Sequence, residues 1–511
     1  MLRRFALLAA LLALAGCAAQ EQNATLRIAD LANPTSLNPL LAHDQETIGN
    51  DLLTVQTLTG LDEHNRVIPL LLTRIPSRQN GDVSADGKRI TYRLKHGVRF
   101  ADGVELTSAD VAFTYRAIID PRNPVLSQDT YKRIASIDTP DRYTAVLHLK
   151  QRWNAAVSDL FAQSDFAFGI LPAHAFKSTV LANADWENHA FGTGPFRVAQ
   201  WRRGDRIVLE PNPYFSPRPL LRRIELRMIP DVNTAFVALR THDVDIAVLR
   251  TPQILAQART TPHLRIQRTL LNDTEELDLQ TQTAPTDNVK VRRAIAQALD
   301  MRGIAKAYDG IYPPGGSFIP PVMSGVFDSG IHAYPHDVRP ALALMRDKAP
   351  DVVIIVQSEF DLGKRIATVV QQQLSQAGFH ATIKPYPTAL FNAPDGPARN
   401  GRFTISLSGW LGGADPEQSI VLTCDKVSLN GDNLARFCNK RFDADFADQA
   451  VTTDPARRRR DFIDMQHIVH DQVPQIPLYY ETWYDGLNDR VGGFARNMLE
   501  FPVAPEKWSK Q

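Results

Sequence analysis

The first half of the chain alternates apolar and polar residues in several short stretches. Residues 90–94, 143–149 and 224–228 each place an apolar side chain at every second position. A repeat of two residues is typical of a strand with one buried face. We therefore expect the region from about residue 25 to 268 to be rich in short strands.

A helix is predicted between the first two of these strands. Thr107 followed by Asp110 has the spacing of a capping box, in which side-chain oxygens accept hydrogen bonds from exposed backbone N–H groups. Apolar residues then recur on one face as far as Ile119, and Pro121 marks the end of the helix.

From about residue 287 the pattern changes. Val291, Ala294 and Ala298 keep helical spacing, which places Arg292 on the face expected to meet water. An apolar run at 352–356 is followed by a longer helix and a further strand.

The segment from residue 352 to 384 reads as one βαβ unit. Val352 to Val356 is continuously apolar, as expected for a strand buried on both faces. A helical pattern then runs to a predicted C-cap at Gly378, and a strand pattern follows. This order predicts an α/β fold with a parallel or mixed sheet. Two different lobes in one chain suggest a cleft between them.

The N-terminus carries an export signal. Arg3 and Arg4 precede an apolar run from Phe5 to Ala15, whose eleven residues are too few for a span of about 20. The following Leu14-Ala15-Gly16-Cys17 resembles the lipobox of bacterial lipoproteins. We expect cleavage before Cys17, lipidation of its thiol, and attachment of an exported protein to a membrane. A plain secretory signal with a chance cysteine is the alternative.

Composition and charge exclude several classes of protein. The chain has 511 residues, 44% of them hydrophobic and 22% charged, as in a globular protein with a large core. With 57 basic and 56 acidic residues it is nearly neutral, so nucleic acid is not an expected partner. Its three cysteines are too few for a disulfide-framed fold or a four-thiolate zinc site.

Motifs for catalysis or for metal and cofactor binding are not found in the sequence. It lacks the nucleophile elbow, the zinc-protease helix, the Walker loop and the dinucleotide fingerprint. His467 and His470 are three apart on a predicted helix, but a surface pair is the favoured interpretation. Arg457 to Arg460 is interpreted as a solvated helix face. We expect no catalytic residue, no cofactor and no metal.

Cys424 and Cys438 lie 14 positions apart in an exported chain, where disulfides persist. We interpret them as a disulfide, with two free thiols as the alternative. Such a loop is worth about 3 kcal/mol in chain-entropy terms.

One segment indicates ligand recognition. A strand pattern from Phe403 runs into Trp410, then Gly412, Gly413 and a carboxylate, Asp415, followed by proline. An aromatic ring, flexible glycines and a fixed carboxylate at a strand end make a plausible ligand wall. A surface turn with a packed tryptophan explains the same residues equally well.

Eight short motifs also occur in a characteristic order. They are residues 34–39, 58–61, 84–100, 102–111, 192–196, 212–214, 291–295 and 439–443. In these motifs the chain resembles the family 5 extracellular solute-binding proteins, the peptide- and nickel-binding receptors of bacterial ABC importers. Any one motif is weak, but eight in order are specific.

The resemblance implies an α/β fold of the periplasmic-binding-protein type, a two-lobed clam with an extra subdomain in the first lobe. It also implies a non-catalytic, monomeric receptor that hands an oligopeptide or other small solute to permease and ATP-binding subunits of an ABC importer. The expected hinge lies at chain crossings near Leu271 and Tyr479. The expected division is a signal peptide at 1–16, a tether at 17–24, first-lobe segments at 25–45, 186–269 and 479–511, the extra subdomain at 46–185, and the second lobe at 270–478.

For the ligand, the resemblance assigns Asp415 to the peptide ammonium group. Some short-peptide receptors carry an arginine just after a second-lobe strand, whereas Gln357, Ser358 and Glu359 occupy that place here. Longer peptides and a non-peptide solute with a cationic group therefore stay open. A secreted hydrolase or a sensor lipoprotein is the less favoured alternative.

Overall fold

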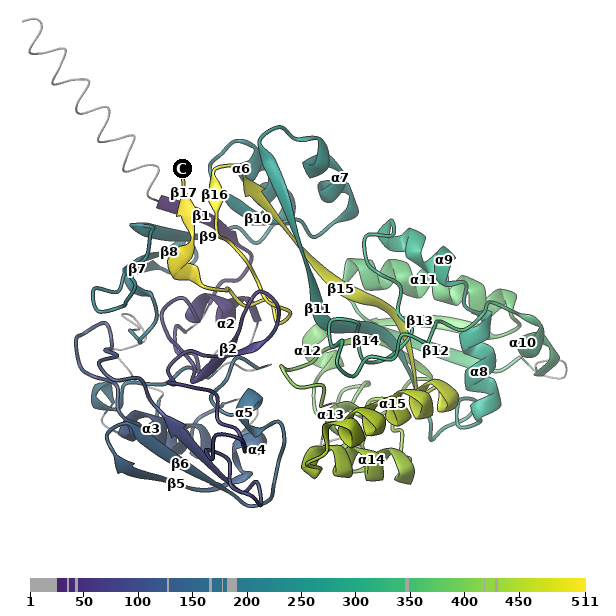
Figure 1. Ribbon diagram of the computed structural model, residues 1–511. Helices are drawn as coiled ribbons and strands as arrows, with labels where there is room; N and C mark the ends of the chain where they lie inside the picture. Colours follow the sequence, from purple (N-terminus) through teal and green to yellow (C-terminus); the bar gives the residue numbers. More distant parts are fainter. Residues whose placement is uncertain are drawn as a thin grey trace, which may run out of the picture. The chain divides into compact units, whose positions relative to one another are not determined.

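The computed structural model describes residues 25–34, 36–41, 45–125, 128–164, 168–176, 178–181, 191–344, 349–417, 419–427 and 431–511. The chain forms two compact units (Figure 1). Unit 1 contains the described residues up to Thr269 together with Trp483–Gln511, and unit 2 is Leu270–Thr482. The chain passes between the units within two long strands, β11 (Leu264–Leu279) and β15 (Gln475–Asn488).

In unit 1 the main strands lie in the order β15-β10-β1-β9-β8-β7. β1 is parallel to both of its neighbours, β9 and β10, and the remaining neighbours pair antiparallel. The strands of this unit are β1 (Thr25–Asp30), β2 (Thr59–Leu61), β3 (Val67–Pro69), β4 (Arg89–Arg93), β5 (Ile134–Asp141), β6 (Thr144–Leu149), β7 (Phe196–Arg202), β8 (Arg206–Pro211), β9 (Arg223–Met228), β10 (Ile246–Val248), β16 (Val491–Gly492) and β17 (Ser509–Lys510). Its helices are α2 (Gln45–Asp51), α3 (Ser108–Ile119), α4 (Gln128–Tyr131), α5 (Ala156–Asp159), α6 (Val232–Arg240) and α7 (Pro252–Thr260).

The three strands predicted from alternation are confirmed: two of them are β4 and β6 of a separate three-stranded sheet, β4-β6-β5, and the third is β9 of the main sheet. In β4 the inward residues Ile90 and Tyr92 are buried while the strand's terminal arginines are exposed. Helix α3 begins after Thr107, whose backbone N–H donates to the Asp110 carboxylate at 2.7 Å. It ends at Ile119, as the proline two positions later predicts.

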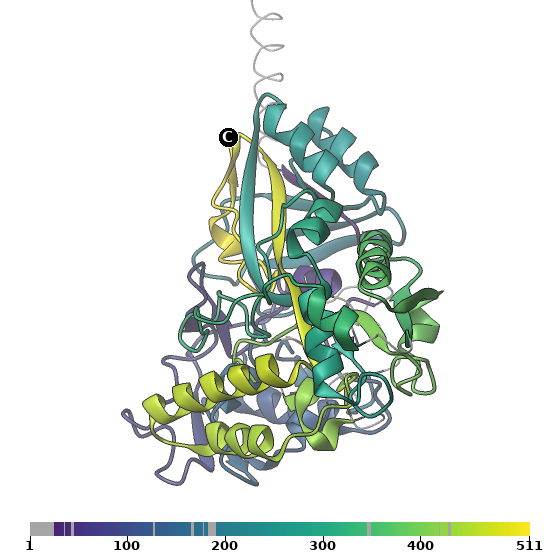
Figure 2. The ribbon, with the colours of Figure 1, turned by 90° about the vertical axis from the view of Figure 1, so that its right-hand side faces the viewer.

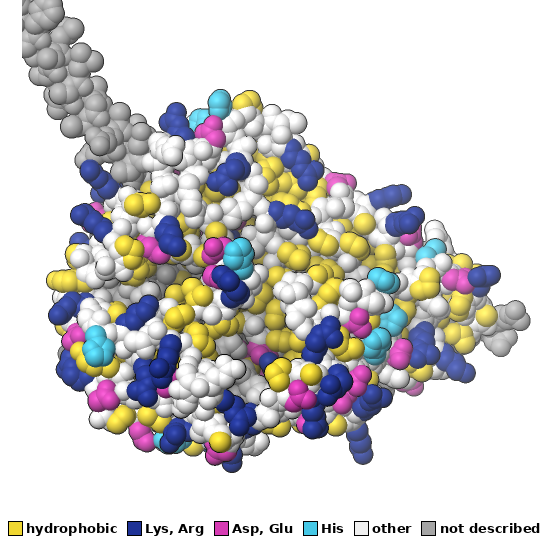
Figure 3. All heavy atoms as spheres, in the orientation of Figure 1, with side chains coloured by type: hydrophobic (Ala, Val, Ile, Leu, Met, Phe, Trp, Pro, Cys, Tyr) yellow, Lys and Arg dark blue, Asp and Glu magenta, His cyan; other side chains and the backbone are white. Residues whose placement is uncertain are grey.

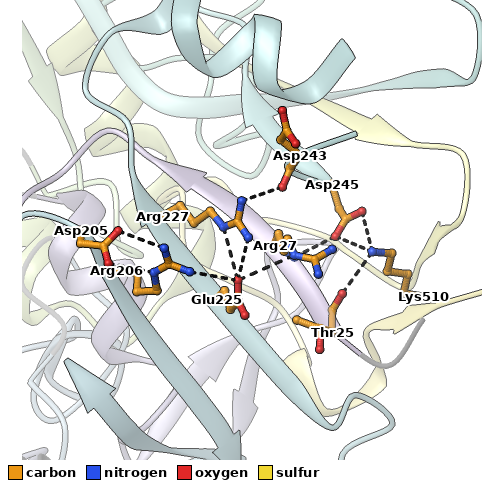
Figure 4. A network of polar contacts seen from close by, with 9 residues as sticks. All are labelled: Thr25, Arg27, Asp205, Arg206, Glu225, Arg227, Asp243, Asp245 and Lys510. Carbon is orange, nitrogen blue, oxygen red and sulfur yellow. Dashed lines mark hydrogen bonds and ion pairs between the residues drawn. The ribbon is translucent and has the colours of Figure 1, made fainter. Parts of the chain in front are cut away.

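A buried ion pair fixes the first strand of unit 1 to its last (Figure 4). Lys510 Nζ lies 2.9 Å from the Asp245 carboxylate and donates to the Thr25 carbonyl oxygen at 3.2 Å. Asp245 also accepts the Arg27 backbone N–H at 2.8 Å. The Lys510 and Asp245 side chains are only 8% and 2% exposed, so each charge depends on the other for compensation.

In unit 2 the strands lie in the order β13-β12-β14-β11-β15. β12 and β13 are parallel and joined through α11, which packs on both. The predicted βαβ unit is therefore confirmed. The further strands are β12 (Asp351–Gln357), β13 (His380–Tyr386) and β14 (Ile405–Leu411), and the helices are α8 (Val289–Ala298), α9 (Met301–Ala305), α10 (Arg339–Leu344), α11 (Asp361–Gln376), α12 (Thr388–Phe391), α13 (Ser419–Leu422), α14 (Lys440–Val451) and α15 (Pro455–Gln472).

Helices α14 and α15 lie side by side in both views (Figures 1 and 2). Helix α15 also contacts α8, and this contact corrects one expectation. Arg292 was expected to meet water, but it is 5% exposed. Its guanidinium donates to the Gln472 and Thr286 carbonyl oxygens, both at 2.8 Å. One carbonyl group at the end of α15 and one in the segment before α8 thus supply the acceptors that compensate for the burial of the guanidinium group.

The predicted signal peptide, the tether and Cys17 lie outside the described residues. Among the residues that are described, none of the helices combines the length and the apolar character that a membrane crossing requires. On the face drawn in Figure 3, basic and acidic side chains are interspersed, in keeping with the nearly neutral sequence.

Candidate functional site

A cavity of about 220 Å³ lies entirely among residues of unit 2. Strands β11 and β14 supply one wall, through Glu276, Asp278, Ser408 and Trp410. The last residue of β12 and the first residue of β15, Gln357 and Gln475, also line it, as do residues from α12, α13 and two loops. Strand ends therefore bring polar groups from distant parts of the sequence to one place.

The pairing of β11 with β14 explains which side chains face the cavity. The strands are antiparallel, with Glu276 opposite Ser408 and Thr274 opposite Trp410. Side chains of directly opposed residues lie on the same face of a sheet, and alternate residues of a strand share that face. Glu276 and Asp278 therefore point to the same side as Trp410, whereas Glu275 points to the other.

Gln475 holds the two cavity carboxylates together. Its Nε2 donates to Glu276 Oε1 at 2.6 Å and to Asp278 Oδ1 at 3.0 Å. The Ser408 hydroxyl donates to the other oxygen of Asp278. All of these contacts are in a buried setting, since Glu276, Asp278 and Gln475 are 4%, 3% and 2% exposed.

Burial changes the acidity of both carboxyl groups. It raises the pKa of Asp278 to about 6, although Ser408 and Gln475 donate hydrogen bonds that act in the opposite direction. Burial also raises the pKa of Glu276 well above its ordinary value, and the nearby Asp278 and Glu275 carboxylates add to this increase. The charged forms are disfavoured because neither group has a cationic partner among the described residues.

The remaining walls are mostly apolar, with Asn392 and one ion pair as the polar groups. Phe391 and Ala398 line the cavity and belong to a buried cluster with Ile355 and Phe403. Arg399 also lines the cavity, but its Nη2 already lies 2.5 Å from Asp432 Oδ1.

The predicted Cys424–Cys438 disulfide is confirmed. The loop that it closes contributes Asp432 and Leu434 to the cavity. Inside the loop, Asn433 donates to the Thr423 and Phe437 carbonyl oxygens at 2.9 and 2.8 Å. The bridge and this asparagine together fix one wall of the cavity.

The predicted recognition segment is divided between two roles. Trp410 lines the cavity, and its indole Nε1 is buried without a hydrogen-bond partner. Gly412 and Gly413 are instead tied to Asn272 of β11: the Gly412 N–H donates to the Asn272 carbonyl, and the Asn272 side chain donates to the Gly413 carbonyl, both at 2.7 Å. These glycines do not line the cavity, so their part in ligand binding stays a prediction.

Asp415 is buried and already has a cationic partner. Arg458 Nη2 donates to both of its carboxylate oxygens, at 2.7 and 2.8 Å, and to Gln449 Oε1 at 3.0 Å. Burial raises the pKa of Asp415, while the Arg458 charge acts in the opposite direction. Asp415 is 9% exposed, and its assignment to a ligand ammonium group stays a prediction.

The same contact corrects the interpretation of the basic run at 457–460. Arg457, Arg459 and Arg460 are exposed as expected, but the Arg458 side chain is only 24% exposed. It turns inward because Asp415 and Gln449 both offer acceptors to its guanidinium group.

The two histidines on α15 have different neighbours. His467 Nε2 lies 3.0 Å from Asp328, and His470 stacks on Tyr334 with ring centroids 4.4 Å apart. More generally, the residues that the structure describes contain no cluster of three or more metal-binding side chains.

Two features of the site were not anticipated from the sequence. The first is the pair Glu276 and Asp278, which alternates with leucines in a way that also suits a strand with a solvated face. The second is Gln475, at the start of a strand 197 positions after Asp278. The high density of acidic residues at 273–278 was a signal that could have indicated Glu276 and Asp278. The sequence around Gln475 contains no comparable signal.

Two α/β units, with a chain that crosses between them in two strands, are the arrangement of the periplasmic-binding-protein fold. The solved structure of the oligopeptide-binding protein AppA from Bacillus subtilis, in complex with a nonapeptide, has this fold: the TM-score is 0.78 at 22% identity, over 95% of this chain and 99% of that one. The predicted fold class is thus confirmed.

The sequence comparisons define the family. The model for bacterial extracellular solute-binding proteins, family 5, matches residues 66–428, and the chain belongs to this family. The di/tripeptide-binding protein 2 of Pseudomonas aeruginosa is 26% identical, over 83% of this chain and 84% of that protein. The heme-binding protein A of Haemophilus influenzae is 24% identical, over 82% of this chain and 81% of that protein.

Proposed function

We propose that this protein is the substrate-binding receptor of an ABC importer that captures oligopeptides and delivers them to membrane permease subunits. The observation that carries the proposal is the cavity at Trp410, where apolar walls adjoin buried hydrogen-bonding groups. Such a combination suits a peptide, since its side chains need apolar surface and its polar groups need fixed partners. The peptide-binding relatives, which match most of the chain, support this assignment.

The receptor binds its solute without changing it and uses neither a cofactor nor a metal. It acts as a monomer, with the permease and ATP-binding subunits as its protein partners. Membership of a solute-binding family supports this part of the proposal. The cleft and the hinge predicted from the sequence stay predictions.

The mature protein begins at Cys17 and is held to the outer face of a membrane by a lipid on that residue. The lipobox resemblance of residues 14–17 supports this proposal. Intact-mass analysis of protein extracted from membranes should show a chain that starts at Cys17 and carries acyl groups. An unmodified chain that starts at another residue would contradict lipidation.

Native mass spectrometry of the mildly purified protein tests the peptide assignment. We expect bound species with peptide fragmentation patterns, and calorimetric titration with those peptides should then give saturable binding. Trp410→Ala should weaken binding by tenfold or more, while Trp201→Ala, in unit 1, should leave the affinity unchanged. Peptides that are recovered shortened after incubation would indicate a hydrolase, and the absence of any bound peptide would refute the assignment.

A non-peptide solute is the second candidate, and one observation favours it. Strand β12 ends at Gln357, and Ser358 and Glu359 follow, so this strand end presents no arginine to a peptide carboxylate. Glu359 is instead engaged with Thr388, whose backbone N–H donates to it at 2.9 Å. A bound species whose fragmentation spectrum lacks the products of amide-bond cleavage would support this alternative.

A further inference from the structure

We propose that the unit 2 cavity is a subsite for a cationic side chain of the solute, an ammonium or guanidinium group held by Glu276, Asp278 and Gln475. This inference rests on the proposed function and specifies the class of peptide that the receptor prefers, namely one with lysine or arginine.

Charge is the first argument. Glu276, Asp278, Asp432 and Arg399 line the cavity, and Arg399 is neutralised by Asp432 at 2.5 Å. With all groups ionised, the other two carboxylates are left without compensation inside the described part of the chain. A buried carboxylate is unfavourable unless it is paired with a cation. A cation that binds in this cavity is therefore attracted to the two carboxylates and also compensates for the free-energy cost of their burial.

An unpaired acceptor is the second, independent argument. Gln475 uses its Nε2 to hold the two carboxylates, at 2.6 and 3.0 Å. Its Oε1 is buried and has no hydrogen-bond partner, although the residue is only 2% exposed and lines the cavity. A buried acceptor that lines a cavity and has no partner in the protein is available to a donor that arrives with the ligand.

Donor count and geometry favour a cation over a neutral group. The site presents oxygens from Glu276, Asp278 and Gln475 close together, because the glutamine bridges the two carboxylates. An ammonium group offers three donors and a guanidinium five, and neither has an acceptor that would be left unpaired here.

Size and the nature of the other walls agree with this assignment. About 220 Å³ corresponds to roughly seven waters at ~30 Å³ each, close to the heavy atoms of a lysine or arginine side chain. Phe391 and Val421 line the cavity and are buried, which provides apolar surface for the methylene groups of such a side chain.

Fragment binding tests the subsite without relying on peptide transport. The probe is n-butylguanidinium, followed through the indole N–H signal of Trp410, which is the only tryptophan of residues 270–482 and is assigned with Trp410→Phe. We expect a saturable shift in the wild type and its loss in Glu276→Gln/Asp278→Asn. The neutral isostere n-butylurea should cause no comparable shift.

A peptide series then links the subsite to the receptor function. Ala-X-Ala-Ala peptides with X as lysine, arginine, norleucine or glutamate should bind the wild type at least tenfold more tightly when X is basic. The double variant should lose this preference while it still binds the norleucine peptide. Asp361→Asn, an exposed carboxylate on α11, should retain the preference. Circular dichroism confirms folding, and Glu276→Gln alone serves if the double variant is unstable.

The outcomes separate the two proposals. Peptide binding without a preference for basic residues, together with no response to the fragment, would overturn the subsite and leave the receptor function standing. A response to the fragment that depends on Glu276 and Asp278, with no peptide bound, would support the subsite and refute the peptide assignment.

Discussion

The contact between Arg458 and Asp415 leads to a prediction about the stability of unit 2. Arg458→Met keeps most of the side-chain volume and removes the guanidinium group. Asp415, which is 9% exposed, would then lose the donor that contacts both of its oxygens. Gln449 Oε1, which also accepts from Arg458, would lose the same partner.

The expected cost follows from the burial of the pair. Breaking a buried ion pair by removing one partner costs about 3–5 kcal/mol, because the other charge stays buried without compensation. Burial already raises the pKa of Asp415. The folded variant therefore holds the Asp415 proton more tightly than the unfolded chain does. Its stability deficit should be smaller at acid pH and should grow as the pH rises through the raised pKa.

Urea unfolding, followed by circular dichroism, measures this cost for Arg458→Met, Asp415→Asn and the double variant. We expect a coupling energy of about 2–3 kcal/mol, because removing the second partner adds little once the first is gone. Arg459→Met is the matched control, since Arg459 is exposed on the same helix, and it should change stability by less than about 0.5 kcal/mol. If the loss of stability in the double variant equals the sum of the losses in the two single variants, the reasoning is refuted.

The same variants examine the assignment of Asp415 to a ligand ammonium group. That assignment requires Asp415→Asn to reduce peptide affinity by roughly 30-fold or more, which corresponds to about 2 kcal/mol. A folded Asp415→Asn that binds within about threefold of the wild type would limit Asp415 to a structural role.

Three further predictions concern other parts of the molecule. Burial raises the pKa of Asp278 from 3.8 to about 6, so the stability it contributes is present below pH 4 and is lost as the pH rises through 6. Urea unfolding between pH 4 and 7 should show that the free energy of unfolding of the wild type falls by up to about 3 kcal/mol more than that of Asp278→Asn. If the two proteins lose stability in parallel over this pH range, the prediction is wrong. Lys510→Met should cost about 3–5 kcal/mol by thermal or urea unfolding, because Asp245 is 2% exposed and would stay charged; a loss below 1 kcal/mol would show that the pair is dispensable. Alkylation of the unreduced protein should leave Cys424 and Cys438 unmodified, and their replacement by serine should lower stability by up to about 3 kcal/mol.

Local patterns predicted the fold well wherever a local rule decides the structure. The capping box at Thr107 and Asp110 starts α3, and the apolar run of β12 forms a strand paired on both edges. Arg292 shows the limit of this approach. Its position on the helix predicted exposure, but one of the acceptors that permit its burial is the carbonyl oxygen of Gln472, which is 180 positions away.

The candidate site was only partly predictable for the same reason. Trp410 stood out because a tryptophan at a glycine-rich strand end is locally unusual. Glu276 and Asp278 have the alternation of an ordinary half-exposed strand, and their burial depends on Gln475 and on loops much later in the chain. The sequence does not distinguish Arg458 from the other three arginines of the run at 457–460, because its contact with Asp415 arises only in the folded structure.

The two crossings within β11 and β15 have a consequence for how the molecule assembles. Unit 2 is a continuous segment, whereas unit 1 is built from two segments that flank it. If unit 2 were unfolded, bringing those segments together would mean closing a loop on the order of 200 residues, at an entropic cost of about 5 kcal/mol. Because β11 and β15 are neighbouring strands, a folded unit 2 delivers both segments already at strand spacing. Unit 2 can thus serve as an internal template for the pairing of β10 with β15, because the paired residues of these two strands belong to the two different segments of unit 1.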